Sequence, residues 1–498
     1  MLGGRRARCP RLGPVSGAEP TGPIGSAGPG AHQRTGPEGT RAVADTPDAP
    51  EAGPAQHIPA ADPTELGRGG GIRASGGALP RRVASVSLHT SPLEQPGSGD
   101  AGGLNVYTVE VAKRLAARGI ATDVFTRATH PEQPPLVEMA PGVTVRHVPA
   151  GPYGSLDKSA LAHYLCPFIF GVLQAEALND PGHYDLVHGH YWLSGRAGLA
   201  AAQRWGVPLV QSMHTLAKVK NLALAQGDSA EPDYRVRGED HLVRHADHLV
   251  ANTPVESSQL VEHYGADPFR VSTVPPGVDL DVFSPGSRHE ALRRIGLAED
   301  TELLLFVGRV QRLKAPDVLL RSAAALLERD PSLRERLVVA IVGGLSGGDL
   351  AQPRRLAELA RSLGVADVVR WEPPRSRAEL VSFYRAATAT VVPSYSESFG
   401  LVAVESEACG TPVVAARVGG LPTAVRDNVS GVLVDGHDPD DYARVLHRLI
   451  REPARRDALG SAAVAHAARL GWEATVDGLL EVYRGTLVGE RLPMASGQ

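Results

Sequence analysis

The sequence has very little cysteine. Only 3 of its 498 residues are cysteine, and Cys9, Cys166 and Cys409 are far apart, with no paired spacing. This distribution argues against a disulfide framework and against a cysteine-rich zinc site. It is typical of a protein that works in a reducing compartment.

Long hydrophobic runs and a strong excess of one charge are also missing. No apolar run in the sequence approaches the roughly 18 residues of a membrane span. Arg5, Arg6 and Arg8 are not followed by an apolar stretch, so the beginning of the chain is a poor signal peptide. The formal net charge of −4 gives no reason to expect nucleic acid or an anionic membrane as a partner. We therefore expect a cytoplasmic protein that binds neither.

The first part of the chain differs in composition from the rest. Residues 1–80 are rich in glycine and proline and poor in the apolar residues that build a core. Such a segment buries too little apolar surface to offset its chain entropy. We expect residues 1–80 to form a disordered tail.

From Arg82 onward, short β-branched runs alternate with amphipathic helical patterns. This alternation predicts parallel sheets with helices on both faces. A loose, proline-containing stretch at 275–286 predicts a linker, so we expect an α/β protein with two doubly wound domains at 81–280 and 281–474. The predicted strands are 83–88, 122–126, 185–188, 208–213, 248–251, 302–307, 337–342, 368–371, 390–392, 411–415 and 432–434.

Ligands of doubly wound sheets bind beyond the carboxyl ends of the strands, so the loops there are the candidate sites. The first strand is followed by a glycine-rich loop, and Gly102 and Gly103 open the next helix. Free backbone N–H groups at the positive end of a helix suit a phosphate, although a glycine-rich turn without a ligand is also common. The loop lacks the dinucleotide pattern G-x-G-x-x-G, which disfavours NAD.

Two cations follow the first strand of the second domain. Arg309 and Lys314 are five residues apart and could both reach one diphosphate. There they would offset charge that builds on a leaving phosphate. The alternative is a pair of solvated surface cations, the commoner fate of these residue types.

Two carboxylates, Glu397 and Glu405, surround the sequence Phe-Gly-Leu. If the segment is helical throughout, they lie about two turns apart on a similar face. A carboxylate can accept two hydrogen bonds from a ribose diol, so this pair suits a nucleotide sugar. A glutamate pair alone occurs often by chance, but Gly410-Thr-Pro and Gly419-Gly420 in the same frame strengthen the interpretation.

Together these motifs resemble the retaining glycosyltransferases of the family that includes sucrose-phosphate synthases. Within it, the segments HTSPLEQPGSGDAGGLNVY, HGHYWLSG, MHTLAKVKN and FVGRVQRLKAPDVLL resemble the D-inositol 3-phosphate glycosyltransferases of mycothiol biosynthesis. The resemblance implies a GT-B fold, with a last helix at 475–498 that crosses back to the first domain. It also implies a homodimer that transfers N-acetylglucosamine from UDP-GlcNAc to 1D-myo-inositol 3-phosphate.

The resemblance further implies roles for individual residues. On the donor side it implies Gln95, Pro96, Gly103, Arg309, Lys314, Arg375, Glu397 and Glu405. On the acceptor side it implies His89, Asp100, Ala101, Gly102, Gly103, Leu104, Asn105, Lys158, Tyr191, Thr215 and Arg235. The catalytic residues it implies are Arg309, Lys314, His214 and Glu397. No organic cofactor is implied, but a Mg²⁺ ion is, at Tyr384, Arg385, Ala387 and Thr411.

Two alternatives stay open at this point. One is a related transferase, similar to sucrose-phosphate synthase or specific for another sugar or cyclitol phosphate. The other is a catalytically silent protein that binds UDP-sugars, against which the joint presence of Arg309, Lys314, Glu397 and Glu405 argues.

Overall fold

The computed structural model describes residues 79–489, apart from 98–99, 223, 225–228 and 345–351. All of these residues lie within one compact unit. The predicted tail at 1–80 therefore falls almost entirely outside the described residues, as does the end of the chain after residue 489.

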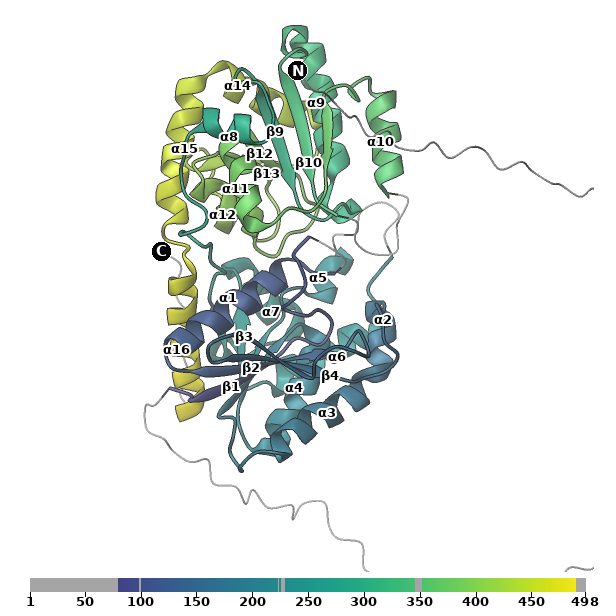
Figure 1. The fold of residues 1–498 in the computed structure, drawn as a ribbon, viewed down its shortest axis with the longest axis vertical. Coiled ribbons are helices and arrows are strands. Elements are labelled where there is room, and N and C mark those ends of the chain that lie inside the picture. The colour runs from purple at the N-terminus through teal and green to yellow at the C-terminus, as the bar shows by residue number, and fades with distance from the viewer. Residues whose placement is uncertain (1–78, 98–99, 223, 225–228, 345–351, 490–498) are drawn as a thin grey trace, which may run out of the picture. The chain divides into compact units, whose positions relative to one another are not determined.

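The first half of the described chain forms an eight-stranded sheet in the order β3-β4-β2-β1-β5-β6-β7-β8 (Figure 1). All neighbours in it are parallel except β3, which pairs antiparallel with β4. Its strands are β1 (Arg82–Val86), β2 (Ala121–Arg127), β3 (Leu136–Ala140), β4 (Val143–Val148), β5 (Leu186–His190), β6 (Leu209–Ser212), β7 (His248–Ala251) and β8 (Val271–Thr273).

Both faces of this sheet are buried, as is usual for a mostly parallel sheet that is covered by helices. Ala84 and Val187 face a core shared with the helices α3, α4 and α6, whereas Val83 and Leu186 face the helices α1 and α16 on the other side. The helices of this half are α1 (Gly103–Ala117), α2 (Lys158–Leu161), η1 (Ala162–Tyr164), α3 (Leu165–Ala177), α4 (Trp192–Trp205), α5 (Ala217–Leu222), α6 (Asp233–His245), α7 (Pro254–Tyr264) and η2 (Pro268–Arg270).

The second half forms a six-stranded, fully parallel sheet in the order β11-β10-β9-β12-β13-β14. Its strands are β9 (Glu302–Val307), β10 (Leu337–Val342), β11 (Val369–Glu372), β12 (Ala389–Val392), β13 (Val413–Ala416) and β14 (Gly431–Val434). Its helices are α8 (Arg288–Arg294), η3 (Arg312–Lys314), α9 (Pro316–Arg329), η4 (Pro331–Leu333), α10 (Gln352–Ser362), α11 (Arg377–Ala386), α12 (Leu401–Ala408), α13 (Leu421–Ala424), α14 (Pro439–Arg451) and α15 (Pro453–Ala467).

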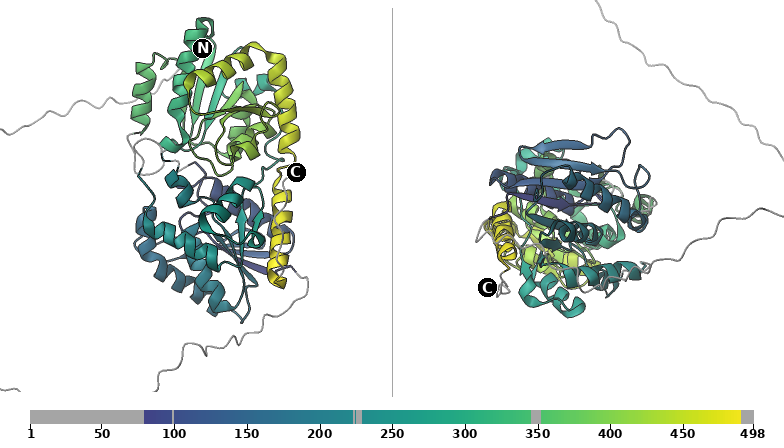
Figure 2. Two further views of the ribbon diagram at one scale, coloured as in Figure 1. Left: turned by 180° about the vertical axis from the view of Figure 1, so that it is seen from behind. Right: turned by 90° about the horizontal axis from the view of Figure 1, so that it is seen from below.

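The last helix, α16 (Trp472–Val488), returns to the first sheet. Its buried residues Trp472, Val476 and Tyr483 pack in one core with Val83 of β1 and Tyr107 of α1. In Figures 1 and 2 it is the yellow helix beside α1. Trp472 N donates a hydrogen bond to Val278 O, so the crossing point is tied to the segment between the two sheets.

That segment is less loose than its composition suggests. Phe283, within the predicted linker at 275–286, is fully buried in the core of the second domain. The strands β3, β4 and β8 were not predicted, because β3 is half-exposed and β8 is only three residues long. The remaining predicted strands are confirmed to within about two residues at each end.

One stretch, Lys158–Ala177, is apolar and long enough to cross a membrane by length and composition, and only 17% of it is buried. Its apolar run is interrupted by Lys158, His163 and Glu176, so it passes this test by mean hydropathy and length only. The stretch is composed of α2, η1 and α3, which follow one another without a break. One such helix is weak evidence for membrane insertion, because core helices of soluble proteins and signal sequences pass the same test.

Candidate active site

A cavity of about 710 Å³ opens at the carboxyl ends of the strands of both sheets. Residues that follow β1, β5, β6 and β7 line it from the first domain, and residues that follow β9, β11 and β12 line it from the second. The sequence-predicted residues among its lining are His89, Gln95, Pro96, Asp100, Gly102, Gly103, Leu104, Lys158, Tyr191, His214, Thr215, Arg235, Arg309, Lys314, Arg375, Glu397 and Glu405.

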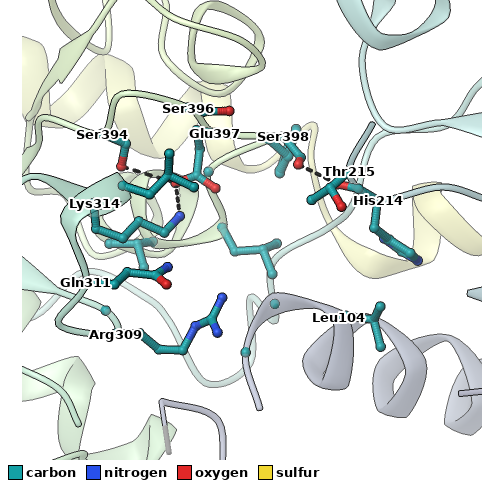
Figure 3. Close-up of a pocket in the computed structure, with 18 of the residues that line it drawn as sticks. Leu104, His214, Thr215, Arg309, Gln311, Lys314, Ser394, Ser396, Glu397 and Ser398 are labelled. Atoms are coloured by element: carbon teal, nitrogen blue, oxygen red, sulfur yellow. Dashed lines mark hydrogen bonds and ion pairs between the residues drawn. The ribbon is translucent and has the colours of Figure 1, made fainter. Parts of the chain in front are cut away.

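The two cations that follow β9 both project into the cavity (Figure 3). Lys314, at the end of η3, forms an ion pair with Glu397, and Ser394 Oγ donates a 3.4 Å hydrogen bond to the same carboxylate. Arg309 Nη1 lies 3.6 Å from Asp100 Oδ1 of the first domain. Burial lowers the pKa of Arg309, although Asp100 and Glu397 oppose the shift. A guanidinium with so little water around it interacts strongly with an anion.

Two glycines hold the loop that carries Glu397. A Cβ at Gly419, whose φ is +52°, would lie 2.1 Å from Glu397 O. A Cβ at Gly420 would lie 2.2 Å from Ser398 O, and Gly420 N donates a 2.8 Å hydrogen bond to Glu397 O. Only glycine allows this backbone approach. The Gly-Gly pair therefore fixes where the Glu397 carboxylate lies.

Glu405 lies on α12 and is separate from Glu397, because residues 397–400 precede the helix. The condition for a shared face, a segment that is helical throughout, is not met: the helix begins only at Leu401, after Gly400 in a left-handed conformation. Tyr384 Oη donates a 2.8 Å hydrogen bond to Glu405 Oε2. Burial raises the pKa of Glu405 to about 7, against the opposing effect of Arg377.

The first domain contributes a second group of cations. Arg235 Nη2 donates a 3.0 Å hydrogen bond to Thr215 Oγ1, and its guanidinium lies 5.0 Å from the centre of the Tyr191 ring. Lys158 Nζ lies 5.9 Å from the same ring and 3.4 Å from Asp100 Oδ1. Burial lowers the pKa of Lys158, against the attraction of Asp100. This arrangement of donors suits a phosphate dianion.

Asp100 thus joins the two groups of cations. The same oxygen, Oδ1, lies near Lys158 Nζ of the first domain and Arg309 Nη1 of the second. Two anions bound by these cations would be close neighbours in one cavity.

Two histidines, His89 and His214, also line the cavity, together with the two groups of cations. His89 packs against Tyr191 with ring centres 4.6 Å apart, and burial, followed by the charges of Lys158, His214 and Arg309, holds its pKa well below the usual range. His214 has a left-handed backbone, with φ of 60°, and its carbonyl accepts a hydrogen bond from Ser398 Oγ of the second domain (Figure 3). Burial lowers the pKa of His214 to about 4. Both rings are therefore neutral at neutral pH.

The structure does not bring two of the predicted acceptor residues to the cavity. Ala101 is fully buried, and Asn105 is 1% exposed. The side chain of Asn105 accepts from Gly102 N at 2.9 Å and donates to Thr90 Oγ1 at 2.7 Å and Ser91 O at 2.6 Å. Asn105 therefore shapes the loop at the start of α1 from behind.

The four residues of the predicted magnesium site lie outside the cavity lining. Tyr384 O already accepts hydrogen bonds from Thr411 Oγ1 at 2.6 Å and from Ala387 N at 3.1 Å. The Arg385 guanidinium, itself a cation, donates to Ser284 O nearby. Within the described part of the chain, no group of three or more His, Cys, Asp or Glu side chains could hold a metal ion. The Mg²⁺ ion implied at these residues would rely largely on backbone oxygens, and it stays a prediction.

Sequence reasoning missed several residues of the cavity. Ser398 bridges the domains, and Arg377 forms a 2.6 Å ion pair with Glu110 of the first domain. Asn252 and Glu256, which follow β7, also line the cavity. None of these stands out in a sequence, because their significance depends on which strand ends face one another.

The two halves of the chain match family models, and the fold has counterparts among solved structures. A family model described as Glycosyl transferases group 1 matches residues 287–466, and one described as Glycosyl transferase 4-like domain matches residues 102–277. Among solved structures, the sucrose-phosphate synthase of Thermosynechococcus elongatus is similar, with a TM-score of 0.74 and 30% identity over 81% of this chain and 98% of that one. Anabaena Alr3699/HepE, solved in complex with UDP and glucose, has a TM-score of 0.63 and 19% identity over 80% and 98%. These neighbours confirm the GT-B fold.

Curated relatives are much more similar in sequence. The D-inositol 3-phosphate glycosyltransferase of Nocardiopsis dassonvillei is 71% identical over 419 residues, which cover 84% of this chain and 98% of the relative. The protein of the same name from Thermobifida fusca is 70% identical over 408 residues, or 82% of this chain and 94% of the relative. This chain is a glycosyltransferase and belongs to the family of D-inositol 3-phosphate glycosyltransferases.

Proposed function

We propose that the protein transfers N-acetylglucosamine from UDP-GlcNAc to 1D-myo-inositol 3-phosphate with retention of configuration, which is the first step of mycothiol biosynthesis. The observation that carries the proposal is the meeting of the two cation groups at Asp100. A transfer between a sugar diphosphate and a phosphorylated acceptor needs two anion sites at this short separation. The relatives at 71% and 70% identity support this acceptor in preference to that of sucrose-phosphate synthase, which is only 30% identical.

In this proposal the second domain binds the donor. Arg309 and Lys314 bind the diphosphate, and Gly103 at the start of α1 adds a backbone N–H group. Glu397 accepts hydrogen bonds from the sugar, Glu405 accepts them from the ribose, and the Arg375 loop contacts uracil. Gln95 and Pro96 close over the donor from the first domain. All of these residues line the one cavity.

The first domain binds the acceptor. Lys158, Tyr191, Thr215 and Arg235 form the phosphate site, and the Thr215 hydroxyl is oriented by its hydrogen bond with Arg235. His89 and Asp100 face the inositol hydroxyls. These groups fix the acceptor oxygen near the anomeric carbon, and such positioning supplies a large part of the rate.

Retention requires attack from the face that the leaving group occupies, or a covalent intermediate. A covalent intermediate would need a carboxylate nucleophile. The two carboxylates that line the cavity from the second domain already have partners, because Glu397 pairs with Lys314 and Glu405 accepts a hydrogen bond from Tyr384. We therefore propose same-face substitution. The C–O bond to UDP breaks ahead of acceptor attack, and the leaving phosphate accepts the proton of the acceptor hydroxyl. Arg309 and Lys314 stabilise the charge on UDP, a term that is large in a closed cleft. Mg²⁺ enters no step.

The experiment is a UDP-release assay on the purified protein with UDP-GlcNAc, with and without inositol 3-phosphate, followed by NMR of the product linkage. We expect release that depends on the acceptor and an α-linked product. Fructose 6-phosphate as acceptor and UDP-glucose as donor serve as matched controls, because they keep the phosphate and diphosphate. Release only with one of these pairs would contradict the proposed substrates and leave the fold assignment intact. A parallel reaction in EDTA tests the metal.

We also propose that the protein acts as a homodimer in the cytoplasm. The exposed Cys166 and buried Cys409 are both free in the structure, which is compatible with a reducing compartment. Size-exclusion chromatography with light scattering tests the dimer, and a mass near one chain of 52.4 kDa would contradict it.

A further inference from the structure

Behind His214, the first sheet carries two buried histidines that the proposed mechanism does not use. His188 and His190 lie two residues apart on β5, so both point to the face that α1 and α16 cover. His190 Nδ1 lies 3.2 Å from His214 Nε2. His188 is held at both ring nitrogens, by Ser212 Oγ at 2.9 Å and by Tyr483 Oη of α16 at 2.7 Å.

These contacts hold the His214 ring from behind. The ring centres of His188 and His190 are 4.2 Å apart, and those of His190 and His214 are 5.4 Å apart. Tyr107 of α1 packs edge-on against both His190 and His214. A rigid layer of aromatic side chains therefore separates the cavity wall at His214 from α16.

The protonation of this layer is restricted. Burial lowers the pKa of His188 to about 3 and that of His214 to about 4, and it holds the pKa of His190 well below the usual range. At neutral pH each ring is neutral and carries one N–H. A single proton then lies between His190 Nδ1 and His214 Nε2. If His190 Nδ1 carries this proton, the proton of His214 is on Nδ1, which is then a donor. If His214 Nε2 carries it, His214 Nδ1 is an acceptor.

We propose that His190 is a positioning residue for the transfer reaction: its Nδ1 fixes the tautomer and the ring orientation of His214. His214 needs such a support because its backbone is in the left-handed region, with φ of 60°, where a residue with a Cβ is strained. Its carbonyl also accepts the hydrogen bond of Ser398, next to Glu397. By holding the ring, His190 holds this carbonyl at the point where the two domains meet. The kinetic consequence alone rests on the proposed function, with His214 in the catalytic role that the family resemblance implies for this residue of the cavity lining.

Three variants separate positioning from packing. His190→Asn keeps a polar group near the place of Nδ1, His190→Gln places it near Nε2 instead, and His190→Phe keeps the ring without either nitrogen. His248→Phe is the matched control. His248 is another buried strand histidine of the same sheet, bonded to Ser272 Oγ at 2.9 Å, and it does not line the cavity.

We expect His190→Phe and His190→Gln to lower kcat about tenfold, which corresponds to about 1.4 kcal/mol of activation free energy. KM for both substrates should stay within about twofold, and His190→Asn should recover most of kcat. His248→Phe should lower the melting temperature and leave kcat unchanged. A kcat for His190→Phe equal to that of the wild type, in a folded protein, would overturn the proposal.

A spectroscopic readout keeps the test independent of turnover. In ¹⁵N-histidine-labelled protein, the ¹⁵N shifts of the two ring nitrogens report the tautomer, and His214→Gln assigns the signal. We expect one tautomer of His214 in the wild type and in His190→Asn, and a mixture or the other tautomer in His190→Phe. An unchanged tautomer in His190→Phe refutes the positioning role, whether or not the substrates are those proposed. Absence of transfer by the wild type, with the tautomer shift present, refutes only the proposed function.

Discussion

Replacement of Arg309 by methionine tests the proposed leaving-group site most directly. The side chain is 24% exposed, and its Nη1 lies 3.6 Å from Asp100 Oδ1. Two unit charges about 4 Å apart interact by about 4 kcal/mol at the effective dielectric constant of about 20 that is typical of such sites. A diphosphate at the distance of Asp100 would therefore gain an interaction of this order.

If that interaction strengthens as UDP leaves, its loss lowers kcat. Loss of one preorganised charge or hydrogen-bond donor at a developing anion typically lowers kcat about 10²–10³-fold. We expect a decrease in this range for Arg309→Met, measured as UDP release at saturating substrates. UDP affinity, measured by calorimetry, should fall by a smaller factor, because the ground-state diphosphate carries less charge at the breaking bond.

Arg312→Met is the matched control, since Arg312 lies in the same loop, is exposed and does not line the cavity. It should leave kcat within about twofold, which is within the scatter expected for a surface substitution. A folded Arg309→Met variant whose kcat is within about threefold of the wild type would refute the reasoning, because the guanidinium would then stabilise no charge that develops during the reaction.

Three further outcomes follow from the cavity and its surroundings. Lys158→Met should raise KM for inositol 3-phosphate about tenfold or more and leave UDP affinity unchanged, since Lys158 belongs to the acceptor side; an equal loss for both ligands would contradict this division. Glu405 has a pKa of about 7 and must be ionised to accept two hydrogen bonds from a ribose, so UDP affinity should weaken as pH falls through 7 and the weakening should be absent in Glu405→Gln. Burial raises the pKa of Glu407 to about 9. Between about pH 4.5 and 9 the folded state therefore binds more protons than the unfolded state, and it loses stability as the pH rises through that window. The melting temperature of Glu407→Gln relative to the wild type should therefore increase from pH 5 to pH 8.5, and a constant difference would contradict the protonated state.

The doubly wound fold could be predicted because the central strands of the second sheet are almost entirely apolar. Val339 of β10 and Val414 of β13 face one core, and Ala340 and Val413 face the other, so no polar residue interrupts the pattern. β3 escaped prediction because it is a half-exposed edge strand, whose burial pattern shows no continuous run. The apolar pattern therefore identifies most strands of both sheets and misses the half-exposed β3 and the three-residue β8.

For the site, the sequence indicates residue types at strand ends but not their partners. The prediction that Arg309 and Lys314 reach one ligand needed only their position after a strand. The role of Asn105 depends on a hydrogen bond with Thr90, fifteen residues earlier, which turns a polar side chain away from the cavity. The contact between Ser398 and His214 joins residues 184 positions apart and has no local signal. Motif spacing therefore cannot separate a residue that binds a ligand from one that supports the loop beside it.

Asp100 connects the proposed acceptor site with the proposed donor site, because it lies near a cation of each. Without an anion nearby, Lys158 and Arg309 would repel each other across the cavity, and the carboxylate between them offsets that repulsion. A phosphate that binds either cation competes with Asp100 for it and weakens that ion pair. The carboxylate then becomes available to accept a hydrogen bond from an acceptor hydroxyl, at the point where the donor diphosphate lies. Asp100 can thus hold the empty cavity together and orient the acceptor once both anions are bound, which explains why an acidic residue lies in a site built for two anions.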